Sequence, residues 1–115
     1  WEYAARGGRK SKGYLYAGSN HIEEVAHTLS NRKAHEQSPV AQYKPNELGL
    51  YDMTGNVWEW CADWYRKSPT SRPSTNFHVI RGGGHDCYPR YCRSTNRFMY
   101  DQRRRRDLVG FRLAL

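Results

Sequence analysis

The sequence lacks the features that would place it within a membrane. No apolar run approaches the roughly 20 residues of a membrane-spanning helix. No basic segment followed by an apolar one opens the printed sequence. We therefore expect neither a transmembrane segment nor an export signal within these 115 residues, a length typical of one domain or of part of one.

Aliphatic residues are also scarce. Hydrophobic residues make up 37% of the chain, and the mean hydropathy is −1.00. Aromatic residues make up 14%, with four Trp and nine Tyr, so they must supply much of the buried area. This composition is typical of a folded chain and argues against disorder.

The net charge of +8 is a local property of the last third. Residues 81–115 carry nine Arg and three Asp, a net charge of +6, whereas residues 1–80 carry ten Lys or Arg against eight acidic residues, a net charge of +2. The excess peaks in the run Arg103–Arg106. A basic patch can bind phosphates, but no recognised nucleic-acid motif accompanies this one. We therefore do not expect a nucleic-acid partner, and a solvated basic loop stays open as the alternative.

The three cysteines do not decide the redox compartment. Cys61 lies among tryptophans and is most simply a small buried hydrophobic residue. Cys87 and Cys92 are five positions apart, which is compatible with a disulfide, a thiolate metal site or neither.

Short strands separated by long irregular connections are the expected architecture, which is an α+β fold. Trp1–Ala5 is typical of the end of a helix, and residues 13–46 show little periodicity apart from a candidate element at Val25–Leu29. Alternating apolar and polar residues predict four strands, at Val57–Tyr65, Phe77–Arg81, Tyr91–Arg97 and Val109–Leu115. Residues 66–76 are expected to form a turn between the first two strands.

Four segments, in this order and spacing, resemble the formylglycine-generating enzyme or sulfatase-modifying factor family: Trp1–Gly8, Pro45–Trp60, Arg81–Gly83 and Gly110–Leu113. The resemblance implies a variant of the C-type lectin fold, with Trp58, Trp60, Phe111 and Leu113 buried. Members of the family are longer, so we expect residues 1–115 to be the C-terminal part of a single domain.

The resemblance also implies a calcium site in the turn after Pro45. In the enzymes of the family, Ca²⁺ is held by side-chain and carbonyl oxygens at positions that correspond here to Asp52, Gly55, Val57 and Glu59. A hard cation prefers such oxygen ligands. The alternative is a metal-free turn in which Asn56 and Glu59 bind the backbone.

A catalytic role is one reading of the cysteine pair. Catalytic members use two cysteines five residues apart to bind copper(I) and to oxidise a substrate cysteine with O₂, and Cys87 and Cys92 match those positions. Soft thiolates do select Cu(I). The surroundings depart from the enzyme pattern, however: Gly84 replaces a Ser, Tyr88 replaces a His, and Arg93–Asn96 replaces a basic-aromatic stretch. Cys92–Ser94, with Arg97 following, instead resembles the non-catalytic branch, in which a single Cys is structural.

The segment 84–108 indicates a binding role instead. It mixes Tyr, Arg, Asp and His as a binding surface does. It also lies where the variable proteins of diversity-generating retroelements, which resemble the same family, carry their ligand-binding positions. All seven residues from His85 to Tyr91 are permitted outcomes of adenine mutagenesis of an Asn codon. We expect these contact residues: His85, Asp86, Tyr88, Arg90, Tyr91, Phe98, Tyr100, Arg104, Arg106 and Asp107.

The preferred prediction is therefore a non-catalytic protein that binds a protein or other macromolecular ligand, with a cell-surface or extracellular location favoured by the resemblance. The copper- and oxygen-dependent enzyme is the alternative, and a family member with neither role is the third reading. Arg97 and Arg105 are expected to belong to the scaffold.

Overall fold

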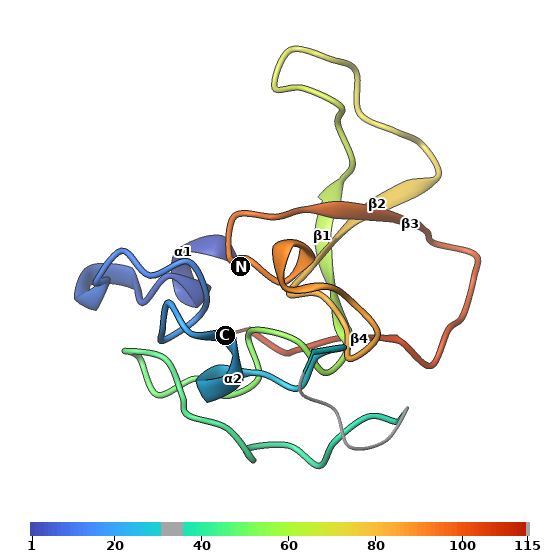
Figure 1. The fold of residues 1–115 in the computed structure, drawn as a ribbon. Helices are drawn as coiled ribbons and strands as arrows, with labels where there is room; N and C mark the ends of the chain where they lie inside the picture. The colour runs from blue at the N-terminus through green and yellow to red at the C-terminus, as the bar shows by residue number, and fades with distance from the viewer. Residues whose placement is uncertain (31–35, 115) are drawn as a thin grey trace.

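A computed structural model of the chain describes residues 1–30 and 36–114 (Figure 1). Two helices, two 3-10 turns and four strands are separated by long connections, as expected for an α+β fold. In chain order these elements are α1 (Glu2–Ala5), η1 (Gly8–Lys10), α2 (Ile22–Val25), β1 (Trp58–Trp64), β2 (Phe77–Arg81), η2 (Pro89–Tyr91), β3 (Phe98–Asp101) and β4 (Val109–Gly110).

The four strands form one sheet in the order β3-β2-β1-β4. β2 pairs antiparallel with both β1 and β3, whereas β4 runs parallel to β1. The β1–β2 register shifts between Trp60 and Trp64. Because side chains alternate between the two faces of a strand and cross-strand partners share a face, one face gathers aromatic residues. We call it the aromatic face; it carries Trp58, Trp60, Trp64, His78, Ile80, Phe98 and Tyr100.

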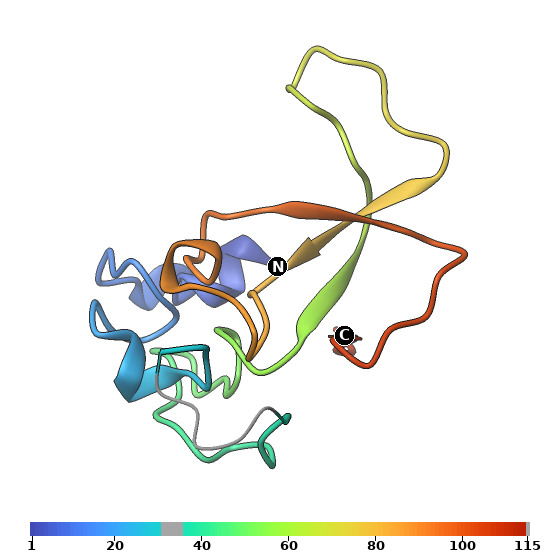
Figure 2. The same cartoon turned by 45° about the vertical axis from the view of Figure 1, so that its right-hand side comes forward.

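Two connections project from the sheet, one between β1 and β2 (residues 65–76) and one between β3 and β4 (residues 102–108), as Figures 1 and 2 both show. Arg97 ties the first connection to the start of β3, because its guanidinium lies 5.1 Å from the Tyr65 ring centroid and donates to the Lys67 carbonyl. Arg97 thus contacts residues outside segment 84–108, and its expected place in the scaffold stays a prediction.

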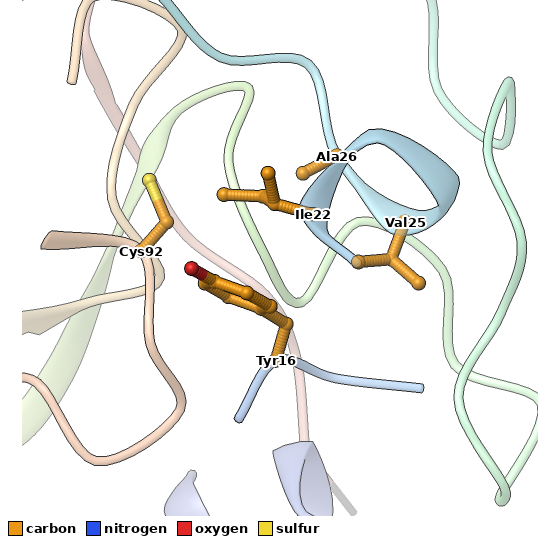
Figure 3. Close-up of a cluster of buried hydrophobic side chains, with 5 residues drawn as sticks. All are labelled: Tyr16, Ile22, Val25, Ala26 and Cys92. Atoms are coloured by element: carbon orange, nitrogen blue, oxygen red, sulfur yellow. The ribbon is translucent and has the colours of Figure 1, made fainter. Parts of the chain in front are cut away.

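Most of the buried hydrophobic residues form two small clusters, and Trp58, Val79 and Ile80 are buried in the sheet. One joins Tyr16 to α2 and to Cys92, and Figure 3 shows the hydroxyl end of Tyr16 beside Cys92, a residue from a distant part of the sequence. The other packs Ala5, Ala17 and Met53 together, with Trp1 at its edge. Both clusters are small, as the scarcity of aliphatic residues requires.

Asn46 secures the turn that begins the central motif. Its amide nitrogen donates to the carbonyl oxygens of Ala4 and Ala5, and its amide oxygen accepts from the backbone of Leu48 and Leu50. These four bonds satisfy a buried amide on both sides and join α1 to the central turn.

The predicted helix at Trp1–Ala5 and the strands at Val57–Tyr65 and Phe77–Arg81 are confirmed to within a residue at each end. The element predicted at Val25–Leu29 is wrong, since the helix there is Ile22–Val25 and precedes it. The strand predicted at Tyr91–Arg97 is also wrong. Pro89 begins the η2 turn, bends follow it, and the strand starts only at Phe98.

The C-terminal strand is shorter than predicted. β4 covers Val109–Gly110 only, because just these two residues pair with β1, and Leu115 lies outside the described residues. Past the pairing, Phe111 and Leu113 are 76% and 85% exposed, so their predicted burial is wrong. Trp58 is buried as predicted, whereas Trp60 is only partly buried, and so is Cys61.

Candidate functional site

A hollow of about 300 Å³ lies on the aromatic face and is the centre of the candidate site. Its floor is formed by the sheet residues Trp58, Ile80, Phe98 and Tyr100. Segments from both sides complete the lining with Asp86, Cys87, Tyr91, Arg106, Leu108 and Val109. We call it the aromatic hollow.

The strand register explains why these residues meet. Ile80 pairs with Phe98 across β2 and β3, and Trp58 pairs with Val109 across β1 and β4. Cross-strand pairs of this kind place their side chains on the same face. The Trp58 and Phe98 rings consequently lie 5.9 Å apart between centroids, although Phe98 remains 53% exposed.

Three neighbouring side chains form an exposed ridge beside the hollow. The Arg90 guanidinium lies 5.2 Å from the Tyr88 ring centroid and 4.7 Å from that of Tyr91, and it donates to the Tyr91 hydroxyl at 3.1 Å. Tyr88 is 56% exposed and Tyr91 37% exposed. The stacking holds two rings toward solvent in one arrangement, which lowers the entropy that a ligand contact would cost.

Backbone contacts anchor the segment that carries this ridge. The His85 amide donates to the Asn56 carbonyl at 2.7 Å, and the Ser94 amide donates to the Leu15 carbonyl at 3.0 Å. Arg81 donates to the carbonyls of residues 94, 95 and 96, and Arg81 also pairs with Glu2 at 3.0 Å. The loop is therefore held mainly through its main chain.

The arginine run borders the other side of the hollow. Arg103 contacts the Asp101 carboxylate through Nε and Nη2, at 3.0 and 2.8 Å, and these hydrogen bonds lower the pKa of Asp101 to about 2. Arg104, Arg106 and Asp107 are exposed. Arg105 is also exposed, and its expected place in the scaffold stays a prediction.

A second, more polar hollow of about 550 Å³ adjoins the first through Asp86, Arg106 and Leu108. Its lining also includes Glu36, Gln37, His85 and Asp107. His85 is only 6% exposed, and its ring centroid lies 6.1 Å from that of His27. Among the predicted contact residues, His85 thus offers a ligand the least surface.

The three cysteines are free thiols. Burial raises the pKa of Cys92 to about 12, and this thiol is 0% exposed, packed so closely on Gly83 that a β-carbon there would overlap its sulfur. Cys87 is partly buried; it lines the aromatic hollow and packs against the cluster that contains Cys92. Burial raises the pKa of Cys87 as well. The two thiols therefore lie in one neighbourhood, but only Cys87 reaches the hollow.

The four positions of the expected calcium site line one further hollow, of about 550 Å³, together with Arg112. Glu59 already accepts from Arg112, at 2.7 Å from Nη2, and from the Trp1 indole at 2.7 Å. Asp52 accepts from the Ala41 amide at 2.8 Å. Asn56 bonds both the amide and the carbonyl of Ser38, as in the metal-free alternative.

These oxygens suit a hard cation in kind, but the charge of Glu59 is already balanced by Arg112. Within residues 1–30 and 36–114, no three His, Cys, Asp or Glu side chains group together as a metal cluster. Ca²⁺ at these four positions would compete with Arg112 for the Glu59 carboxylate, and the calcium site stays a prediction.

The structure places the ten predicted contact residues around the aromatic hollow in three ways. Five line the hollow itself: Asp86, Tyr91, Phe98, Tyr100 and Arg106. His85 and Asp107 line the polar hollow beside it. Tyr88, Arg90 and Arg104 are exposed and line neither.

Sequence reasoning missed part of this surface. It assigned Trp58 to the core alone and overlooked Ile80, Leu108 and Val109, which complete the hollow, as well as His78 and Trp64 farther along the same face. The even-numbered aromatic residues of the Val57–Tyr65 segment were a usable signal for the aromatic face. The cross-strand neighbours were not, because they depend on register.

Over residues 1–115, the sequence matches the sulfatase-modifying factor enzyme 1-like domain. The chain belongs to this family. Its structure has the C-type lectin-like α+β fold of the formylglycine-generating-enzyme type. No helix among the residues that the structure describes is long and apolar enough to cross a membrane.

Relatives of the chain carry different names. The chain is 40% identical to the chaperone protein LppX of Paenibacillus barcinonensis over 73% of its length and 35% of that protein. It is 36% identical to the formylglycine-generating enzyme of Streptomyces coelicolor over 80% of its length and 36% of the enzyme. The chain thus spans about a third of the length of these curated relatives.

Among solved structures, Treponema denticola variable protein 1 superposes with a TM-score of 0.84 at 32% sequence identity, over 96% of this chain and 43% of that protein. The family therefore includes relatives named as enzymes and, on the same fold, a relative named as a variable protein. The decision between these roles depends on the site.

Proposed function

We propose that this protein is a non-catalytic ligand-binding protein whose binding surface is formed by residues 84–108 around the aromatic hollow. The observation that carries the proposal is the exposed ridge of Tyr88, Arg90 and Tyr91 beside the hollow. Exposed aromatic rings and an arginine around an apolar hollow are the composition of protein-binding sites.

The way this segment is held supports the same role. Its ends are fixed by hydrogen bonds to the main chain, so the side chains of the ridge are available to a ligand. The likeness to Treponema denticola variable protein 1 supports a surface of the diversified kind, in which the binding residues differ from copy to copy while the scaffold is kept.

The formylglycine-generating alternative has one observation in its favour, the position of Cys87 in the hollow and its packing beside the cluster that contains Cys92. Bound copper(I) would supply the oxygen chemistry, and Cys87 and Cys92 would be its ligands. Cys92, however, has no exposed surface and is enclosed by Gly83 and Tyr88, to whose carbonyl its thiol donates at 3.8 Å. This packing is typical of a structural cysteine.

The nucleotide sequence around the gene tests the proposal directly. A diversified protein requires a near-repeat of the 84–108 coding segment that differs at adenines, together with a reverse transcriptase gene nearby. Absence of both, combined with tight 1:1 copper(I) binding that is lost in Cys87→Ser and in Cys92→Ser, would refute the binding proposal in favour of the enzyme.

Binding itself is tested with a library of displayed random peptides selected against the purified protein. Tyr88→Ala combined with Tyr91→Ala should abolish binding of the selected peptides, because both rings are exposed and stack on Arg90. The melting temperature should change little. Tyr3→Ala is the control, since Tyr3 is an exposed aromatic residue on α1, outside segment 84–108. If the double variant instead lost stability as severely as it lost binding, the two rings would belong to the core.

A further inference from the structure

The aromatic surface continues beyond the hollow and beyond residues 84–108. Tyr100, which lines the hollow, lies 5.7 Å from Trp60 between ring centroids. His78 links Trp60 to Trp64, at 6.3 and 4.0 Å between ring centroids. We call this row the aromatic strip; it consists of Phe98, Tyr100, Trp60, His78 and Trp64.

The strip is open to solvent at both ends. Phe98 is 53% exposed at one end and Trp64 is 40% exposed at the other. A shallow depression of about 310 Å³, lined by Trp60, His78 and Gln102 among others, lies along it. Two hollows connected by aromatic rings suit a ligand that is longer than one side chain.

Positive charge borders the strip on two sides. Segment 84–108 carries seven Arg and three Asp. Asp101 and Arg103 pair with each other, so neither contributes to the excess of positive charge. The connection between β1 and β2, residues 65–76, adds Arg66, Lys67 and Arg72 and contains no acidic residue. The charge of both projecting connections therefore favours an acidic partner.

We propose that the ligand is an acidic polypeptide segment that lies along the aromatic strip, inserts one apolar side chain into the aromatic hollow and pairs its carboxylates with the flanking arginines. This inference rests on the proposed binding function and specifies its partner. A hollow of about 300 Å³ is at the small end of ligand pockets, which suits one anchoring side chain. Arg106 lines the hollow and supplies forked donors to a carboxylate beside that anchor.

A polypeptide fits this surface better than a nucleic acid does. The ring planes along the strip are tilted to one another, by 54° between Trp60 and Tyr100 and by 85° between Trp60 and His78. Successive bases stack on exposed ring faces, whereas these rings cover one another's faces and edges. Asp86 also lines the hollow and would repel a phosphate.

Two pairs of variants test the inference with peptides from the displayed library. Selected peptides should be acidic and should carry an aromatic or aliphatic anchor. Arg104→Glu combined with Arg106→Glu should weaken their binding at least about tenfold, since flanking charges and anchor contacts dominate such interfaces. The matched control is Arg9→Glu combined with Lys10→Glu on η1, which places the same charge change on exposed residues outside segment 84–108 and the strip.

Trp64→Ala should also weaken binding, whereas Tyr3→Ala should not, because only Trp64 belongs to the strip. Circular dichroism confirms that each variant is folded, and Trp64 is exposed enough at the end of β1 for the fold to persist. Raising the NaCl concentration should weaken binding of the acidic peptides to the wild-type protein.

The possible failures are distinguishable. Selected peptides without an acidic excess that still require Tyr88 and Tyr91 would overturn the acidic partner but leave the proposed function intact. Peptides that never require Tyr88 and Tyr91 would overturn both. Tighter binding of a single-stranded oligonucleotide through Arg104 and Arg106 would assign the surface to nucleic acid. Dimerisation in light scattering that Trp64→Ala abolishes would assign the strip to a second copy of the chain.

Discussion

Replacing Arg112 by Ala should destabilise the protein by about 3 kcal/mol. Breaking a buried ion pair by removing one partner costs about 3–5 kcal/mol, because the remaining charge loses its compensation. Glu59 is 6% exposed and would keep only the Trp1 indole as a donor, since three of its contacts come from Arg112, at 2.7, 3.1 and 3.1 Å. The Arg112 side chain is 33% exposed, so solvent reduces the cost to the lower end of that range.

The loss should appear as a melting temperature lower by about 12–24 °C, since each kcal/mol shifts the midpoint of a domain of this size by about 4–8 °C. Thermal unfolding followed by circular dichroism and urea unfolding followed by tryptophan fluorescence measure it. Arg6→Ala is the matched control, because Arg6 and Glu2 form an exposed pair of the same chemistry at 3.3 Å, worth about 0.5 kcal/mol or less.

A double-mutant cycle with Glu59→Gln separates the pair from other effects of the arginine. The free energies of unfolding lost in the two single variants should add up to more than the loss in the double variant, because the double variant leaves no unpaired charge. A loss below about 1 kcal/mol in Arg112→Ala, comparable with that in Arg6→Ala, would refute the claim that Glu59 depends on Arg112.

Two further predictions concern the metal site and the thiols. Calcium should raise the melting temperature of Arg112→Ala more than that of the wild type, because Arg112 balances the Glu59 charge that Ca²⁺ would use. Adding Asp52→Asn should remove this rise. Equal melting curves with calcium and with chelator in both proteins would contradict the site. Iodoacetamide followed by mass spectrometry should label Cys61 and Cys87 well before Cys92, because a thiol with a pKa of about 12 is ionised to only about one part in ten thousand at pH 8. Equal labelling of Cys61 and Cys92 would show that Cys92 is not buried. The Cys92 thiol ionises near its ordinary pKa of 9.0 in the unfolded chain and near 12 in the folded one, so the free energy of unfolding should fall as the pH rises between those values.

Local patterns predicted the elements that depend on neighbouring residues. The alternation in Val57–Tyr65 and the glycines after Arg81 were sufficient for β1 and β2. β3 was misplaced because its position depends on pairing with β2 rather than on its own pattern. The segment where the strand was expected instead forms the end of the η2 turn, which begins at Pro89, and the bends that follow it.

The tail shows a different reason for failure. Phe111 and Leu113 alternate with polar residues as a half-buried strand does, yet only Val109–Gly110 reach a partner strand. Arg112, the polar residue between them, is the one whose guanidinium contacts the buried Glu59. The pattern in the tail therefore does not mark a buried apolar face, and its contact with the buried Glu59 is made by Arg112.

The candidate site could be predicted in outline and not in extent. Exposure of Tyr88 and Tyr91 followed from the composition of the loop. The aromatic strip did not, because His78 reaches Trp64 only through the shifted register between β1 and β2. Such a contact joins two strands and cannot be predicted from the residue pattern of either strand alone.

Arg81 has a consequence for how the protein can change over generations. Its guanidinium donates hydrogen bonds to the carbonyl oxygens of residues 94, 95 and 96. Every amino acid, proline included, carries that oxygen. The Asn96 side chain also donates to the Tyr91 carbonyl, so position 96 is less free to vary. Mutations at position 95, whose side chain is exposed, can therefore alter what the loop presents while the Arg81 hydrogen bonds stay the same. A saturation-mutagenesis map of folded yield should be permissive there and intolerant at Arg81.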